Sequence, residues 1–349
     1  MKRVTIQDIA DALGISRNTV SKAINNADGL ADATREKILQ KAVEMGYKQF
    51  SYVATLTGST DPIPSIIVSE NPATTGEIAL FTTNIFNQSN HFAASMMDRF
   101  QHELSQLGYI LSVHLVDRDN LTRRTPPATF NKEQCSGIIC IEMFDWAYGE
   151  MICGLGLPVL FVDGPNKRYG NSLPADQLYM ENTLGITKLV NDMLRKGKKR
   201  IGFIGDHEHC QSFFERYIAF RTAMLLADVP VEEQFCLKTV HRGEVEEAIS
   251  ALSEFPDLFI CANDFIAVDA MQALRKMGKS IPEDVLIAGF DDAPESRIVT
   301  PALTTVHIHT QVMAYSAVQL LMTRIKEPAL DYRVVYTETE LICRESTRF

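Results

Sequence analysis

Short apolar segments alternate with amphipathic helical segments along residues 78–290, and this alternation restricts the possible folds more than any other feature. Mostly apolar runs predict strands at 78–82, 110–116, 137–141, 158–162, 200–204, 258–261 and 285–290. Helical spacing of apolar residues predicts helices at 92–107, 183–196, 213–227, 244–253 and 265–277. Strands that alternate with helices form parallel, doubly wound sheets. The strands exceed what one sheet needs, so we expect two α/β lobes with a ligand bound where the carboxyl ends of their strands meet.

A different pattern precedes this region, with two short helices predicted on either side of a sharp turn. The first helix buries an apolar face formed by Ile6, Ile9, Ala10 and Leu13. Gly14 ends it, because glycine enters the left-handed backbone region at little cost. Ser16 fits the N-cap of the second helix. A third helix is expected from Asp32 to about Met45, which completes a three-helix unit.

The second of these helices combines a small apolar back with a polar front. Val20, Ala23 and Ile24 are expected to face the first helix, and the outward positions hold Arg17, Asn18, Ser21 and Lys22. Arg and Lys suit the acceptors of guanine, Asn suits adenine, and hydroxyl groups suit phosphates. The pattern predicts a recognition helix for the DNA major groove, because packing alone leaves these exposed side chains without a role.

The chain's charge limits where DNA can bind. The formal net charge is −10, yet residues 1–50 carry eight Lys and Arg against six Asp and Glu, whereas the whole chain carries 34 against 44. DNA contact is therefore expected only in the N-terminal three-helix unit. Its small positive balance is too weak for tight binding, so we expect two such units to act together in a homodimer.

The cellular compartment follows from what the chain lacks. No segment approaches the roughly 18 apolar residues of a membrane span, and the first residues lead directly into a helix rather than a signal peptide. The seven cysteines are scattered and odd in number, which favours reduced thiols. We expect a cytoplasmic protein.

The two patterned regions together resemble the lac repressor/galactose repressor family of transcription factors over nearly the whole chain. In the N-terminal region the resemblance rests on Val4-Thr5-Ile6-x-Asp8-Ile9-Ala10, Ser16-x-x-Thr19-Val20-Ser21-Lys22 and Thr34-Arg35-Glu36-Lys37-Ile38 through Gly46-Tyr47. In the remainder it rests on Ala262-Asn263-Asp264, Ile281-Pro282-Glu283-Asp284-Val285, Gly289-Phe290-Asp291-Asp292, Leu303-Thr304-Thr305-Val306 and Arg344-Glu345-Ser346-Thr347. Each motif is weak alone, and their joint occurrence in order carries the resemblance.

The resemblance implies an all-α helix-turn-helix headpiece followed by a two-lobed, periplasmic-binding-protein-like α/β body. The boundaries expected from the sequence are a headpiece at 1–46, a hinge at 47–57, a linker at 58–77 and an effector-binding and dimerisation domain at 78–349. Within that domain we expect an N-lobe at about 78–178 and 310–336, and a C-lobe at about 179–307 and 337–349.

Family likeness also assigns DNA-contacting residues. It implies base contacts by Arg17, Asn18 and Lys22, and contact with or positioning of the phosphate backbone by Thr5, Ser16, Thr19, Ser21, Asn25, Thr34 and Tyr47. Leu56 stands where the family inserts a leucine into the minor groove. Gln49-Phe50 replaces the usual Pro-Asn, and Val53 replaces the usual Ala. Leu56 is therefore either such a wedge or a simple linker hydrophobe.

For the effector, the resemblance implies contacts by Asn84, Phe86, His91, Phe92, Asp163, Arg216, Asn263 and Asp291. These positions fall at strand ends or helix starts, where the architecture independently places a ligand. An Arg, an Asn and two Asp suit a sugar or sugar derivative, with Phe86 or Phe92 stacking on its apolar face. The alternatives are local: Asp291 or Asn263 could cap a helix, and Arg216 could pair with Glu215 or Asp206.

Other candidate chemistry is weak. His207-x-His209-Cys210 and His307-x-His309 lack a second ligand pair at useful spacing. The first cluster lies in a loop after a strand, so we expect it to be polar cleft lining or surface rather than a zinc site. Gly154-x-Gly156 precedes a strand instead of following one, and neither a P-loop nor a Gly-x-Ser-x-Gly elbow occurs. The basic run Arg195–Arg200 lies at a helix end, where it complements the helix dipole.

The sequence thus predicts a ligand-responsive, sequence-specific repressor that binds a near-palindromic operator as a homodimer. It predicts no enzymatic activity and no cofactor. A solute-binding receptor without a DNA role is the alternative, against which the intact recognition helix speaks. An enzyme with a regulatory headpiece finds no support from a nucleophile, metal or cofactor motif.

Overall fold

The computed structural model describes residues 6–24, 31, 34–35, 37–38, 41–42, 45, 76–83, 91–167, 170, 172–239 and 242–348. The chain forms two units, residues 1–68 and residues 69–349, which are considered one at a time. Several predictions lie outside the described residues, namely the hinge, most of the linker, and Thr5, Asn25, Tyr47, Leu56, Asn84 and Phe86.

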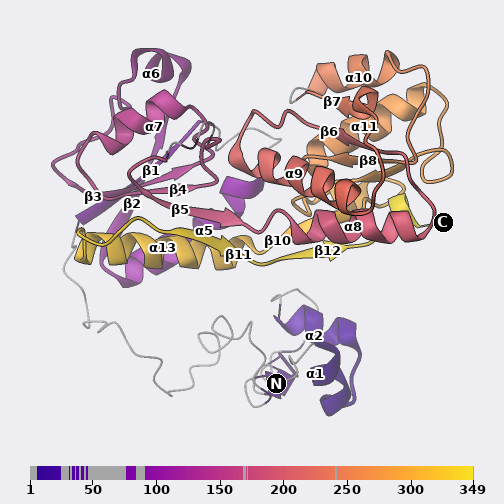
Figure 1. The fold of residues 1–349 in the computed structure, drawn as a ribbon. Helices are drawn as coiled ribbons and strands as arrows, with labels where there is room; N and C mark the ends of the chain where they lie inside the picture. The colour runs from indigo at the N-terminus through magenta and orange to yellow at the C-terminus, as the bar shows by residue number, and fades with distance from the viewer. Residues whose placement is uncertain are drawn as a thin grey trace. The chain divides into compact units, whose positions relative to one another are not determined.

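The N-terminal unit contains the predicted pair of helices, α1 (Ile6–Leu13) and α2 (Arg17–Ile24) (Figure 1). Gly14 between them has φ +66°, as the sharp turn requires. The predicted apolar faces meet in one small core, in which the buried side chains are Ile9, Ala10, Val20, Ala23, Ile38 and Ala42. The described residues between 34 and 42 are helical, in agreement with the predicted third helix.

The second unit has two lobes, the first built on a six-stranded sheet of order β11-β5-β4-β3-β1-β2. Its strands are β1 (Gly76–Thr82), β2 (Tyr109–Leu115), β3 (Cys135–Ile141), β4 (Val159–Val162), β5 (Asp176–Met180) and β11 (Val334–Thr337). Every neighbouring pair is parallel, as the alternation predicts. Helices α5 (His91–Gln106) and α13 (Thr310–Lys326) cover one face, and α6 (Arg118–Arg123) and α7 (Trp146–Cys153) cover the other (Figure 1). We call this part the N-lobe.

The second lobe, the C-lobe, contains a four-stranded parallel sheet of order β7-β6-β8-β9. Its strands are β6 (Ile201–Ile204), β7 (Cys236–Leu237), β8 (Leu258–Cys261) and β9 (Leu286–Ala288), accompanied by α8 (Leu184–Arg195), α9 (Gln211–Leu226), α10 (Arg242–Ser250) and α11 (Asp264–Lys276). An antiparallel pair, β10 (Thr305–Ile308) and β12 (Thr339–Ile342), joins β9 through bridges at Ala288–Thr304 and Asp291–His307. The short helices are η2 (Glu233–Phe235), α12 (Glu295–Ile298) and η3 (Glu345–Thr347).

The chain passes between the lobes three times: from β5 to α8, from β10 to α13, and from β11 to β12 (Figure 1). The N-lobe side of these crossings is held by a buried ion cluster. Asp176 is fully buried and accepts hydrogen bonds from the Arg324 side chain at 3.0 and 3.1 Å and from the backbone N–H of Arg333 at 2.7 Å. One carboxylate on β5 therefore fastens both α13 and the start of β11.

None of the helices in the described part of the chain has the length and apolar character that a membrane crossing requires. The seven cysteines are free thiols, as predicted.

Candidate functional site

Helix α2 presents the predicted base-contacting residues to solvent: Arg17, Asn18 and Lys22 are exposed. The Ser16 side chain caps the helix, because its Oγ accepts the backbone N–H of Thr19 at 3.1 Å. The Ser16 and Thr19 hydroxyls are also hydrogen-bonded to each other at 2.8 Å. The helix is thus fixed at its start while its outward side chains stay available for a partner.

The remaining described residues of the predicted DNA surface are polar and accessible to different degrees. Ser21 is half-buried, and Thr34 is exposed. Arg35 donates from Nη1 to the Lys22 carbonyl oxygen at 3.5 Å, which links the third helical segment to α2.

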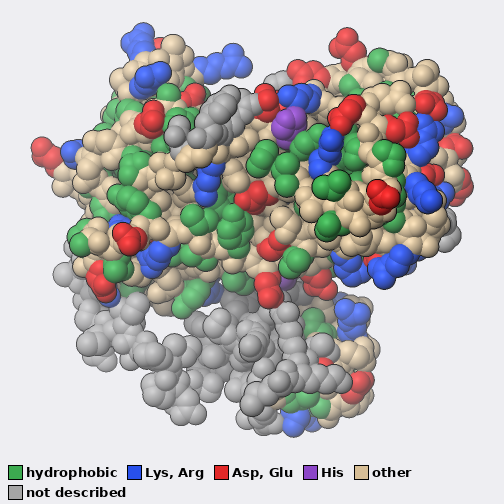
Figure 2. Space-filling view, viewed as in Figure 1, with side chains coloured by type: hydrophobic (Ala, Val, Ile, Leu, Met, Phe, Trp, Pro, Cys, Tyr) green, Lys and Arg blue, Asp and Glu red, His purple; other side chains and the backbone are tan. Residues whose placement is uncertain are grey.

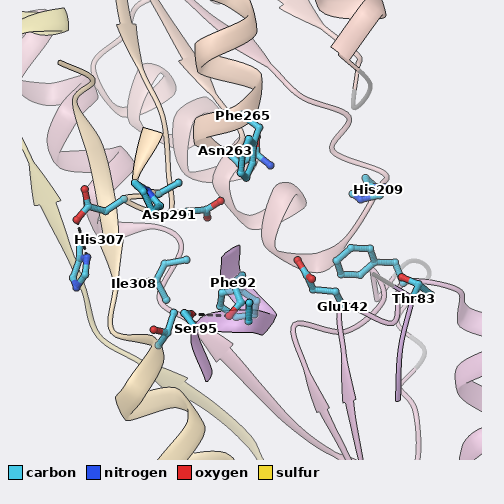
Figure 3. A pocket seen from close by; sticks show the side chains of 16 residues that line it. Thr83, Phe92, Ser95, Glu142, His209, Asn263, Phe265, Asp291, His307 and Ile308 are labelled. Atoms are coloured by element: carbon cyan, nitrogen blue, oxygen red, sulfur yellow. Dashed lines mark hydrogen bonds and ion pairs between the residues drawn. The ribbon is translucent and has the colours of Figure 1, made fainter. Parts of the chain in front are cut away.

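A cleft of about 680 Å³ lies between the two lobes of the second unit (Figure 3). Its wall combines residues that follow β1, β3, β6, β8 and β9 with residues at the starts of α5 and α13. The cleft therefore lies beyond the carboxyl ends of both sheets, where doubly wound folds bind ligands. Three phenylalanines provide much of its apolar surface: Phe92, Phe144 and Phe265.

The predicted effector contacts divide between the wall of this cleft and the layer behind it. Phe92, Asn263 and Asp291 line the cleft. Arg216 is only 2% exposed and lies behind Asp291, with 3.6 Å between Arg216 Nη1 and Asp291 Oδ1. Asp163 is 7% exposed and accepts a hydrogen bond from Ser212. His91 begins α5, and its side chain is outside the described part.

Arg216 is held by groups of the protein on several sides. Its Nε donates to Asn182 Oδ1 at 2.9 Å, and its Nη1 donates to the Ala262 carbonyl oxygen at 2.7 Å. The guanidinium carbon lies 3.5 Å from the centre of the Phe290 ring, a cation–π contact. Neither Glu215 nor Asp206, the partners considered from the sequence, forms an ion pair with it in the described residues; Asp291 does.

Asn263 caps a helix and lines the cleft at the same time. Its Oδ1 accepts the backbone N–H of Ile266 at 2.9 Å, so it is the N-cap of α11. Asn263 can therefore both cap the helix and contact a ligand, because the cap holds its side chain at the cleft wall (Figure 3).

Burial changes the acidity of the two predicted aspartates. Burial raises the pKa of Asp291 to about 7, although Arg216 lowers it and Asp163 raises it further. Burial likewise raises the pKa of Asp163 to about 6, against the lowering effects of Ser212 and Arg216. The positive charge of one buried guanidinium group thus acts on two carboxyl groups. With pKa values of about 6 and about 7, both carboxyl groups can take up a proton near neutral pH.

Residues with strained backbone conformations also lie just beyond the carboxyl ends of strands in both sheets. Glu142, Asp163, Asp291 and Asp292 have φ values of 52°, 53°, 114° and 54°, which non-glycine residues rarely adopt. Glu142 follows β3, Asp163 follows β4, and the Asp291–Asp292 pair comes shortly after β9. Such conformations cost about 1–3 kcal/mol each and gather at ligand sites.

Several lining residues were not predicted from the sequence, among them Glu142, Phe144, Asp292 and His307. Glu142 could have been found, because it directly follows the predicted strand at 137–141. His209 lines the cleft, in agreement with the expectation that the cluster His207-x-His209-Cys210 is cleft lining or surface rather than a zinc site. His307 Nδ1 bonds Asp292 Oδ2 at 3.0 Å. Among residues with described positions, no group of His, Cys, Asp and Glu is arranged to hold a metal ion.

The basic run Arg195–Arg200 is engaged in local ion pairs rather than forming an open patch. Lys198 pairs with Asp257 at 3.8 Å, and Arg200 pairs with Glu232 at 2.8 Å. On the face shown in Figure 2, acidic and basic side chains are interspersed over the C-lobe. This distribution favours a solvated surface over a second DNA site.

Comparisons with known proteins cover the whole chain. Residues 5–49 match the family described as "Bacterial regulatory proteins, lacI family", and residues 190–347 match "Periplasmic binding protein-like domain". The chain is 27% identical to the probable HTH-type transcriptional repressor ExuR of Bacillus subtilis (strain 168), over 99% of this chain and 98% of that protein. It is 28% identical to the HTH-type transcriptional regulator GalR of Lacticaseibacillus casei, over 98% of this chain and 99% of that protein.

Solved structures share the fold. A transcriptional regulator CelR–cellobiose complex superposes with a TM-score of 0.68 at 22% identity, covering 99% of this chain and 100% of that chain. The lac repressor dimer bound to operator and the anti-inducer ONPF superposes with a TM-score of 0.66 at 19% identity, covering 100% of both chains.

Proposed function

Because the chain belongs to the lacI family of bacterial regulatory proteins, we propose that it is a repressor whose operator affinity is set by a small polyhydroxy effector in the cleft between its lobes. The observation that carries this proposal is the cleft itself, which combines Asn263, Asp291 and three phenylalanines at the carboxyl ends of two parallel sheets. The proposal places the protein in the cytoplasm, where its DNA target lies.

The headpiece at residues 1–46 reads the operator through α2. Arg17, Asn18 and Lys22 contact base edges in the major groove, and Ser16, Thr19, Ser21 and Thr34 contact or position the phosphate backbone. The exposure of the first three residues and the capped start of the helix support this division. Thr5, Asn25, Tyr47 and a minor-groove Leu56 complete the proposed surface.

The effector is a sugar or sugar derivative. Carboxylate groups accept hydrogen bonds from hydroxyl groups, amide groups both accept and donate them, and aromatic rings pack on the apolar face of a sugar ring. Besides the CelR–cellobiose complex, two similar structures hold sugars, one D-xylulofuranose and one ribose. Phe92, Asn263 and Asp291 contact the ligand, while Asp163 and Arg216 support Asp291 from behind. Asn84, Phe86 and His91 remain proposed contacts.

The active form is a homodimer that binds a near-palindromic operator. β2 is one of the two edge strands of the N-lobe sheet and exposes three large apolar side chains, with Ile110 58%, Val113 42% and Leu115 54% exposed. An apolar edge strand of this kind is suited to pairing with a second copy. Pairing of two chains also provides two headpieces for one operator. Two are required because the net positive charge of one headpiece is too small for tight binding.

Operator-variant titrations test the DNA assignment. DNA selected from a random pool by the full-length chain serves as the operator, and affinity is measured by fluorescence anisotropy at fixed salt. Arg17→Ala is expected to lose about 1–3 kcal/mol on the selected site and to relax preference at one base position. Thr19→Ala is expected to weaken binding to all sequences alike. The reverse pattern, with uniform weakening by Arg17→Ala, would overturn the assignment.

A further inference from the structure

We infer that the cleft selects an uncharged ligand and discriminates against the carboxylated and phosphorylated forms of the same compound. This inference rests on the proposed effector site and adds the charge class of its ligand.

The described side chains that line the cleft include carboxyl groups but neither a lysine nor an arginine. Among the described residues that line it, none is Lys or Arg, whereas Glu142, Asp291 and Asp292 contribute carboxyl groups. Glu142 and Asp291 stand on opposite sides of the cavity, one from each lobe (Figure 3). Proteins that hold carboxylates or phosphates usually do so with Arg or Lys, whose donors match the ligand's oxygens. An anionic group entering this cleft meets carboxyl groups instead.

Arg216, the cation behind Asp291, already has partners within the protein. It is 2% exposed, donates to Asn182 and the Ala262 carbonyl, and pairs with Asp291 at 3.6 Å. Phe290 covers one face of its guanidinium. A ligand carboxylate would have to displace these partners and enter a layer that the described side chains fill.

Asp292 is likewise balanced within the protein. Its carboxyl group accepts hydrogen bonds from Arg344, Arg297 and His307, and its side chain is 4% exposed. These hydrogen bonds outweigh the effect of burial and hold the pKa of Asp292 well below its usual range. Arg344 and Arg297 therefore face a carboxylate of the protein, and His307, which lines the cleft, bonds to the same carboxylate.

Besides the two lining histidines, His209 and His307, the described wall has only helix N-termini as a source of positive potential, and their contribution is small. Helix α5 begins at the cleft without an acidic residue in its first turn. A helix N-terminus is equivalent to about half a positive charge. At the start of α11, Asp264 lies in the first turn, and burial raises the pKa of its carboxyl group well above the ordinary value. The described wall as a whole is thus close to neutral or slightly acidic.

A neutral ligand fits this wall. Hydroxyl groups can donate to Glu142 and Asp291 and bond with Asn263, and Phe92, Phe144 and Phe265 offer ring faces to carbon-bound hydrogens. Asp291 and Asp292 already form ion pairs with cationic side chains of the protein. A charged group on the ligand, whether positive or negative, would disturb this balance of charge.

A matched library tests the inference on the full-length chain. Neutral sugars, including glucose, galactose, xylose, ribose and cellobiose, are compared with glucuronate, galacturonate, glucose 6-phosphate, ribose 5-phosphate and glucosamine, together with equal numbers of neutral, anionic and cationic metabolites that are not sugars. Binding is found by thermal shift and quantified by calorimetry. The tightest binder is expected to be neutral, and its anionic counterpart is expected to bind at least tenfold more weakly.

The outcomes separate this inference from the proposed function. A neutral binder that is not a sugar would contradict the assignment of a sugar effector but would agree with the inference that the ligand is uncharged. A sugar acid or sugar phosphate that binds more tightly than its neutral parent would support a sugar site and overturn the charge inference. A cationic compound ranked above its neutral parent would overturn it as well.

A variant pair tests the role of the wall directly. Glu142→Gln removes a carboxyl group from the cleft, and Glu150→Gln removes an exposed one on α7. The affinity ratio between the neutral binder and its anionic counterpart is expected to fall severalfold in Glu142→Gln and to stay unchanged in Glu150→Gln. Equal ratios in both variants would contradict the inference, provided that ligand-free thermal midpoints show both variants folded.

Discussion

Arg216 shares its single positive charge between two buried carboxyl groups, and this arrangement makes the floor of the cleft sensitive to protons. Burial raises the pKa of Asp291 to about 7 and that of Asp163 to about 6, from an ordinary value of 3.8. A carboxyl group with a raised pKa in the folded state takes up a proton on folding. Its contribution therefore favours the folded state less and less as the pH rises from about 4 to about 7.

Replacing Asp291 by Asn should reduce this dependence. One such group changes the free energy of unfolding by up to about 1.4 kcal/mol per pH unit. In urea titrations between pH 4.5 and 7.5, Asp291→Asn should lose less stability with rising pH than the wild-type chain does. Asp98→Asn, on the exposed face of α5, serves as the control. Parallel stability curves for Asp291→Asn and the wild type would contradict the assigned pKa.

The sequence indicates which residue types gather at the cleft, but not which of them reach its surface. Asp163, Arg216, Asn263 and Asp291 all lie at strand ends or helix starts, positions that the alternating pattern places near each other. Their depth depends on side-chain packing: Arg216 lies under Asp291 because Asn182 and Ala262 bind it there. Local sequence does not encode such contacts between distant segments.

Elements with strong hydrophobic patterns were predicted, and those shaped by tertiary contacts were not. All seven predicted strands of the second unit and all five predicted helices are present, with ends shifted by up to a few residues. β5 was missed because its buried residues include Asp176 and Gln177, which an apolar pattern excludes. α13 was also missed, although it is the longest helix in the described part of the chain and its buried residues other than Arg324 are apolar.

The same buried charges yield a prediction at the scale of these elements. Asp176→Asn leaves Arg324 buried without its carboxylate partner, which is expected to cost about 3–5 kcal/mol of unfolding free energy. Asp192→Asn, which removes exposed pairs with Lys188 and Arg195 on α8, is expected to cost less than about 1 kcal/mol. Urea denaturation at pH 7 measures both. Equal losses would show that the Asp176 cluster does not fasten α13 to the sheet.

At the scale of the whole molecule, the division into a DNA-reading unit and a ligand-binding unit explains the uneven charge. The N-terminal unit places its exposed Arg, Asn and Lys on one helix, while the acidic remainder of the chain holds the cleft. In the proposed function, specificity then comes from α2, and affinity comes from pairing two chains. The exact boundaries of hinge and linker stay predictions, because those residues lie outside the described part.

Pairing through the edge strand predicts a change in oligomeric state. Val113→Lys places a charge on the exposed edge of β2 and is expected to shift the chain from dimer to monomer, because a buried unpaired charge is costly. Leu226→Lys, at the 80% exposed end of α9, is the matched control and should leave the dimer intact. Analytical ultracentrifugation distinguishes the two. A Val113→Lys variant that remains dimeric would place the interface elsewhere.

Control of DNA binding by the cleft is the central claim, and one titration tests it most directly. The operator affinity of the full-length chain is measured by fluorescence anisotropy with and without a saturating amount of the cleft's tightest ligand. We predict a change in Kd of about 5-fold to 150-fold, in either direction, and the same factor in ligand affinity when operator is added. Identical operator Kd values for the ligand-free and ligand-saturated chain would contradict the account.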